Sequence, residues 1–145
     1  MAKKFQFRLD SILKLRSHKV NLAKDELSRA AGMRSRKDME IEDKENYYHN
    51  LQKSQKGLIS ARELQAHFNH KTFVEEEIKK LQEERVRLQE IENLKMQKLS
   101  TAMQDEKVLE KLKDKKLLEH LGEINKEEIS NLDDVARRIK KDKGE

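Results

Sequence analysis

The residues of this chain best suited to chemistry are two histidines and a pair of adjacent aspartates. His67 and His70 stand three positions apart, a spacing at which one helix could offer two ring nitrogens to a metal ion, while His49 lies elsewhere. No carboxylate accompanies them in a metal-binding motif, so we expect no metal. Asp133 and Asp134 would point about 100° apart on a helix and could not share a proton as a catalytic dyad does. The sequence also lacks a glycine-rich phosphate loop, and we expect neither an enzyme nor a cofactor.

Basic residues concentrate near the N-terminus and could bind phosphates. Residues 1–37 hold eleven Lys and Arg against three Asp and Glu, whereas the rest of the chain holds 22 against 25. A protein that binds nucleic acid through such residues would do so in a strongly salt-dependent way. The basic residues are nevertheless distributed around the expected helix rather than along one face. We therefore expect no nucleic-acid partner, and keep a basic coiled-coil nucleic-acid-binding or adaptor protein as an alternative.

The composition indicates long helices. Of the 145 residues, 42% are charged and 34% hydrophobic, too few apolar side chains for a deep compact core, and proline and cysteine are absent. No segment approaches the ~20 apolar residues of a spanning helix. We expect a soluble, cytoplasmic, all-α protein.

Two stripes of residues follow the alternating three- and four-residue spacing of a coiled coil. In the first, ten of fifteen positions are apolar, and Arg34, Lys37 and Lys44 interrupt its middle. The first stripe contains Leu9, Leu13, Arg16, Val20, Ala23, Leu27, Ala30, Arg34, Lys37, Ile41, Lys44, Tyr48, Leu51, Gln55 and Leu58. The second contains Val74, Ile78, Leu81, Arg85, Leu88, Glu92, Lys95, Leu99, Ala102, Glu106 and Leu109. Beyond Leu112 the apolar positions change register.

The interruption between the stripes predicts a turn. Asn69 tolerates turn conformations, and Thr72 with Glu75 matches a Thr-x-x-Glu capping box, so we expect a turn at about residues 68–72. Gly57 is interpreted as helix interior. The predicted fold is a single antiparallel two-helix coiled-coil hairpin, a rod over residues 1–145, with helices at about 5–67 and 73–140. A dimer of long helices would bury the same stripes, so the sequence leaves monomer and dimer open.

Both ends of the chain resemble a known family. The segment from Phe5 to Arg16 is similar to the start of the flagellar export protein FliJ family, an aromatic-basic-Leu-Asp segment leading to Leu-x-x-Arg. The segment from Glu128 to Arg138 resembles the family's ending, Glu followed by Leu-Asp-acidic-x-Ala and then Arg. Phe73 with the apolar residues after it is similar to the start of the family's second helix. Glu77 departs from the family, which commonly has an apolar residue there.

This resemblance implies a role in the flagellar type III protein export apparatus. It implies a stalk-like coiled coil that binds and promotes the hexameric export ATPase ring, contacts the cytoplasmic domain of the membrane export gate, and escorts export chaperones. It also implies peripheral association with the cytoplasmic face of the cell membrane through these partners. The related stalk protein of virulence injectisomes is the alternative within the same class.

Two groups of residues are the candidate contact sites. We expect the ends of the hairpin arms to contact the ATPase ring through Phe5, Phe7, Leu9, Arg16, Asp133 and Arg137. We expect the region near the turn to contact the export gate through Tyr47, Tyr48, Leu51, Phe73, Ile78 and Leu81. Within the second group, Tyr47 and Phe73 are the better contact candidates, because the other four also fit the coiled-coil stripes.

Overall fold

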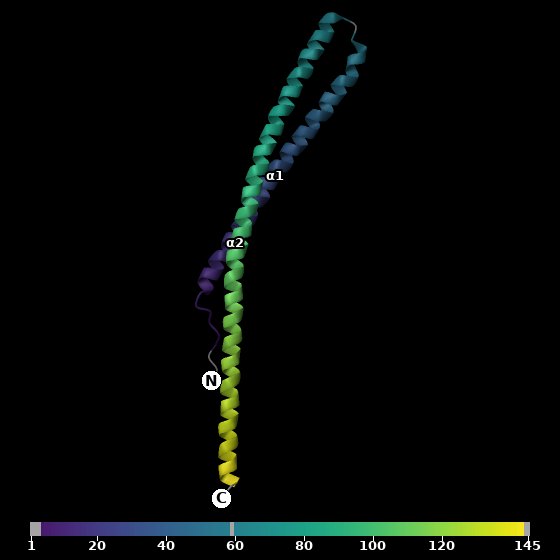
Figure 1. Ribbon diagram of the computed structural model, residues 1–145. Helices are drawn as coiled ribbons and strands as arrows, with labels where there is room; N and C mark the ends of the chain where they lie inside the picture. Colours follow the sequence, from purple (N-terminus) through teal and green to yellow (C-terminus); the bar gives the residue numbers. More distant parts are fainter. Residues whose placement is uncertain (1–3, 59, 144–145) are drawn as a thin grey trace. The chain divides into compact units, whose positions relative to one another are not determined.

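The computed structural model describes residues 4–58 and 60–143 and is an all-α helical hairpin. Helix α1 spans Asp10–Ser54, the short 3-10 helix η1 spans Gln55–Gly57, and helix α2 spans Ala61–Lys143 (Figure 1). The described residues contain no β-strand. None of these helices holds a stretch long and apolar enough to cross a membrane. The expected all-α hairpin is therefore confirmed.

The chain divides into two compact units. The terminal unit consists of Met1–Val20 and Ala102–Glu145, and the turn unit consists of Asn21–Thr101. Both long helices contribute to both units. We describe each unit by itself.

The predicted turn at residues 68–72 is wrong, because these residues lie inside α2. Thr72 does not cap a helix, since its hydroxyl donates to the carbonyl of Phe68 one turn earlier, at 3.0 Å. The cap is Ser60, whose Oγ accepts the backbone N–H of Glu63 at 3.1 Å in a Ser-x-x-Glu sequence. Gly57 ends η1, so its interpretation as helix interior is also wrong. The two helices thus occupy 10–54 and 61–143 rather than 5–67 and 73–140.

The first helix begins later than predicted because the residues before it are extended. Phe5, Phe7 and Leu9 are half-buried, while the polar residues between them are exposed. This two-residue alternation is typical of an extended segment with one face against the protein. The backbone N–H of Asp10 donates to the carbonyl of Phe7 at 3.1 Å, and α1 starts there.

The predicted stripes are confirmed by the burial of their residues. Among the described residues the buried apolar side chains all belong to them, namely Leu13, Val20, Ala23, Ala30, Ile41, Val74 and Leu109. Two of these, Ala23 and Ala30, are small side chains. Helices joined by a short connection pack antiparallel, and they bury one narrow face each.

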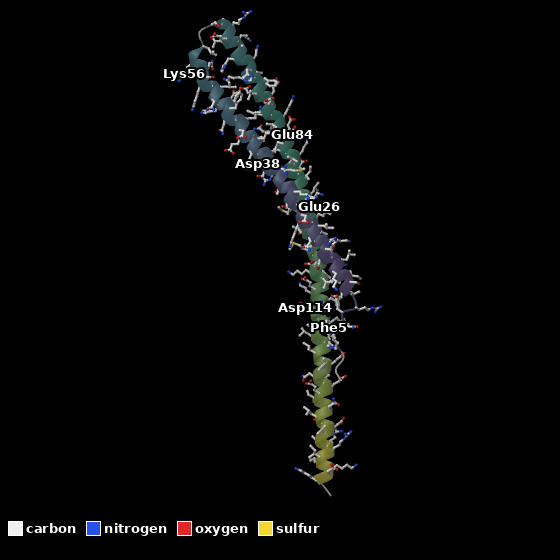
Figure 2. All side chains as sticks on the ribbon, turned by 180° about the vertical axis from the view of Figure 1, so that it is seen from behind. Phe5, Glu26, Asp38, Lys56, Glu84 and Asp114 are labelled. Atoms are coloured by element: carbon white, nitrogen blue, oxygen red, sulfur yellow. The ribbon has the colours of Figure 1, made fainter. Side chains whose placement is uncertain are left out.

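Charged residues that interrupt the stripes are paired across the two helices of the turn unit. Lys37 donates to Glu84 at 2.8 Å, and Lys44 donates to Glu77 at 3.1 Å. Asp38 and Glu84 lie on facing parts of α1 and α2 in Figure 2. Partner numbers fall along α2 as they rise along α1, which is the antiparallel arrangement. The bond from Lys44 gives the carboxylate of Glu77 a charged partner on the other helix.

A second set of ion pairs in the turn unit includes the buried Glu92. Arg34 donates to Glu92, which is 8% exposed, and to Asp38 at 2.7 Å. Arg85 donates to the other oxygen of Asp38, and this bond is the main reason why the pKa of Asp38 is lowered. Because a buried carboxylate is costly without a partner, Arg34 and Glu92 are best regarded as one unit.

Candidate functional site

At the start of the terminal unit, the extended segment lies along α2. The ring centroids of Phe5 and His120 are 5.5 Å apart and tilted by 48°. Figure 2 shows Phe5 beside α2 close to Asp114. An open hollow of about 700 Å³ lies between the segment and α2, lined by residues 4–9 and by Leu112, Lys116, Glu119, His120 and Glu123. Phe5, Phe7 and Leu9 therefore belong to one local arrangement.

Polar contacts fix α1 to α2 just beyond this segment. Arg16 donates from Nη1 to the backbone carbonyl of Asp105 at 2.8 Å. Lys113 binds the carboxylate of Asp10 at 3.2 Å, and Lys14 approaches the same carboxylate at 3.4 Å. These two lysines, Lys113 first, lower the pKa of Asp10. The guanidinium of Arg16, one of the predicted ring contacts, is therefore already hydrogen-bonded within the chain.

The other two predicted ring contacts lie on the last part of α2, which we call the α2 tail, residues 121–143. Ile124 is half-buried, and the remaining side chains of the tail are exposed. Asp133 and Arg137 lie 13 and 17 positions beyond His120, or about 20 and 25 Å along a helix. The structure therefore does not bring them together with Phe5, Phe7 and Leu9. In Figure 1 the tail continues past the N-terminal segment to the end of α2.

The predicted gate contacts divide into two groups in the turn unit. Tyr47 and Phe73 are exposed, at 45% and 56%. The hydroxyl of Tyr47 lies 2.8 Å from Nε2 of His70, and their rings meet edge to face with centroids 5.8 Å apart. His70 precedes Phe73 by three positions, so the two share one side of α2. Tyr47, His70 and Phe73 form an exposed aromatic surface spanning both helices.

The other members of this group face the partner helix. Tyr48, Leu51, Ile78 and Leu81 are half-buried, as their stripe positions predict. Tyr48 donates to Glu75, which raises the pKa of Tyr48, and Lys71 lies 5.5 Å above its ring. These contacts hold the Tyr48 ring in place, so its hydroxyl is already engaged within the chain.

Sequence reasoning missed an apolar pair close to the true turn. Leu64 and Phe68 are 41% and 64% exposed and lie one helical turn apart near the start of α2. The Ser-x-x-Glu sequence at Ser60 could have placed the turn before them. Because we assigned residue 68 to a turn, the pair was not recognised as one helix face.

The comparison with known families agrees with the resemblance that both ends of the chain show. Residues 5–145 match the family described as Flagellar FliJ protein. The chain belongs to this family. No curated protein and no solved structure matches the chain.

Membership in the FliJ family makes the chain a component of the flagellar export apparatus. The match begins at the extended segment and includes the turn and the α2 tail. The extended segment, the aromatic surface near the turn and the α2 tail therefore all lie within the residues that match the family.

Proposed function

We propose that this FliJ-family chain is a non-enzymatic stalk that binds the hexameric export ATPase through its terminal unit. The observation that carries the proposal is the α2 tail, a stretch of helix with exposed apolar and charged side chains on the terminal unit. A protein surface of this kind is typically covered by a partner. Asp133 and Arg137 are both exposed and available for contacts.

Within this proposal the members of the ring-contact group have different roles. Asp133 and Arg137 contact the ring directly. Arg16 fixes α1 to α2 through the Asp105 carbonyl, and Phe5 with Phe7 holds the N-terminal segment against α2. Substitution of Arg16 should therefore disturb the hairpin as well as the contact, which makes Arg137 the cleaner probe.

The decisive experiment measures ATP turnover by the cognate export ATPase with and without this protein, together with the size of the ATPase assembly. We expect stimulated turnover and larger assemblies. Arg137→Glu should weaken both effects, whereas Arg29→Glu, the same charge change at an exposed position in the turn unit, should not. Absence of binding and stimulation by the unmodified protein would refute the stalk function.

The turn unit is proposed to contact the cytoplasmic domain of the export gate. Support comes from the exposed aromatic surface of Tyr47, His70 and Phe73, since aromatic side chains are enriched at binding hot spots. The half-buried Tyr48, Leu51, Ile78 and Leu81 hold the two helices together beneath it. This contact would place the protein peripherally at the cytoplasmic face of the membrane.

Paired substitutions test the gate contact. Tyr47→Ala with Phe73→Ala should weaken capture by the purified gate domain by roughly tenfold or more, the magnitude of a hot-spot pair. Leu94→Ala is the matched control, because Leu94 is an exposed apolar residue of the same unit at 63%. Equal capture of the double variant and the unmodified protein would exclude this surface.

Escort of export chaperones is proposed from family membership alone, and no residues are assigned to it. The match to a flagellar family favours this apparatus over the injectisome alternative. Co-purification with flagellar export chaperones tests the role.

A further inference from the structure

Six ion pairs join α1 to α2 among the described residues of the turn unit. They are Glu26 with Lys95 and with Lys98, Arg34 with Glu92, Lys37 with Glu84, Asp38 with Arg85, and Lys44 with Glu77. All six fit one antiparallel register, in which Lys37 lies against Glu84 and Lys44 lies against Glu77. The charged residues of the two helices are therefore matched to each other in this register.

The apolar stripes by themselves do not select the register. Their residues recur every seven positions, as Val74, Leu81 and Leu88 do on α2. Sliding one helix along the other by seven residues, about 10 Å, would put Val74 at the place of Leu81, and Leu81 at the place of Leu88. An apolar residue would thus replace an apolar residue, and burial of the stripes leaves the choice of register to other contacts.

The connection between the helices excludes a slip in one direction only. Lys44 lies against Glu77, so Ser54, the last residue of α1, is about level with His67, six residues or about 9 Å inside α2. Residues 55–60 span this offset. A slip of seven residues in one direction removes the offset and brings the two helix ends level. In the other direction the offset grows to about 20 Å, close to the full length of a six-residue connection.

Charges oppose the slip that the connection permits. In that slipped register Lys44 would lie against His70, and Arg34, which pairs with Glu92, would lie against Arg85. Glu92 is 8% exposed and would lose the guanidinium of Arg34. A buried carboxylate without its cation is costly, and so is a pair of like charges between two helices.

Other ion pairs of the turn unit would be lost as well. Asp38 would lie against Ile78 instead of Arg85. Among the paired residues of α1, only Lys37 would again meet a carboxylate, that of Glu77. Because exposed pairs contribute little, the selection of the register comes mainly from the less exposed pairs in the middle of the unit.

We infer that Arg34, Asp38, Arg85 and Glu92 form a register lock, a charged cluster that holds α1 and α2 in the observed register against a slip of seven residues. The bond from Arg34 to Asp38, at 2.7 Å, joins the two interhelical pairs into one network. Such a cluster selects one arrangement of the helices rather than adding stability, as single polar residues do between the helices of coiled coils.

The register lock also keeps the exposed aromatic surface together. The hydroxyl of Tyr47 contacts His70 in the observed register, and the slip would bring Tyr47 level with Glu63 instead. Phe73 would move away from Tyr47 together with His70, because both lie on α2. The gate contact proposed above depends on this surface. The lock itself is tested on this chain alone, so that either proposal can fail without the other.

The distance between two spin labels, measured by electron paramagnetic resonance, reports the register. Labels at Arg29→Cys on α1 and Thr72→Cys on α2 occupy exposed positions, and the chain has no other cysteine. The labels should lie about 30 Å apart along the helices, and the slip should shorten this distance by about 10 Å. We expect only the long distance when the lock is intact.

Replacement of the four charged residues by leucine removes the lock. We expect a second, shorter distance in this variant, with a urea midpoint no lower than that of the unmodified lock. The matched control reverses the same four charges and keeps every opposite-charge pair of the cluster, so it should show the long distance only. The leucine variant is Arg34→Leu, Asp38→Leu, Arg85→Leu and Glu92→Leu, and the control is Arg34→Glu, Asp38→Arg, Arg85→Asp and Glu92→Arg.

A second variant favours the slipped register directly. Arg85→Glu with Glu92→Leu sets an acidic residue against Arg34 only after the slip, whereas in the observed register the same residue repels Asp38. We expect mostly the shorter distance, with unchanged helical circular dichroism. The long distance alone in both this variant and the leucine variant would overturn the inference, and so would the shorter distance in the charge-reversed control.

Discussion

Val74 is the side chain on which the packing of the turn unit can be tested most directly. It is 1% exposed and lies one position after Phe73, which is exposed. Val108 provides a matched control, since it is the same residue type in the same helix but 63% exposed. Val74→Ala and Val108→Ala thus remove identical groups from opposite environments.

The expected free-energy change follows from burial. Loss of two buried methyl groups costs about 1.6 kcal/mol in transfer free energy, and the cavity that remains costs up to about 1 kcal/mol more. At Val108 little more than a third of that transfer cost applies, about 0.6 kcal/mol, and no cavity forms. Alanine gains up to about 0.6 kcal/mol in helix propensity at either position. Because that gain is common to both variants, it cancels, and Val74→Ala should be less stable than Val108→Ala by about 1 to 2 kcal/mol.

Urea unfolding followed by circular dichroism at constant pH measures this difference. Val74→Ala should shift the midpoint of unfolding of the turn unit to lower urea, and Val108→Ala should leave it close to that of the unmodified protein. Equal midpoints for the two variants would show that Val74 is not buried between the helices, and would refute the packing described above.

Three further predictions concern the cap and the charged pairs. Ser60→Ala should destabilise the protein by about 1 kcal/mol through loss of the α2 cap, whereas Thr72→Ala should change stability by less than about 0.5 kcal/mol, as urea unfolding of both variants will measure. Lys44→Leu with Glu77→Leu should raise the unfolding midpoint, since it places an apolar side chain at position 44 of the first stripe and another beside the second stripe, while either change alone should lower it. Four carboxylates have a lowered pKa in the folded protein, so their stabilising effect is complete above their ordinary values of 3.8 and 4.5 and is lost as pH falls further. The urea midpoint of unfolding, measured as a function of pH, should therefore begin to fall at about pH 4. The fall should be smaller in Asp38→Asn. The four groups are Asp10, Glu26, Asp38 and Glu84, each bound to Lys or Arg.

The sequence and the structure agree best on the paired stripes. In water, a narrow apolar stripe with three- and four-residue spacing is buried by packing one helix against another. Leu13 and Val74 are buried for that reason, and their burial could be predicted without knowing which residues they meet. The exposure of Tyr47 and Phe73 also followed from spacing, because neither belongs to a stripe.

The turn was misplaced because two capping sequences compete in this chain. Thr72 with Glu75 and Ser60 with Glu63 carry the same local signal. A local signal cannot say which of them lies where the two stripes separate, and in the structure the first lies within a continuous helix. The position of the turn sets the length of each arm, so this one error concealed the unequal lengths of α1 and α2.

By itself, the sequence determined the helical class, the stripe residues and the membership suggested by the two ends, because these depend on composition and on spacing within one segment. Partner choice was decided by tertiary structure. The pairing of Lys44 with Glu77, the bond from Arg16 to the Asp105 carbonyl and the packing of Phe5 on His120 all join residues far apart in the chain. The exposure of the α2 tail was also decided by tertiary structure, since a face of α2 is exposed only where α1 does not lie against it. Spacing along one helix contains no information about where the other helix stops.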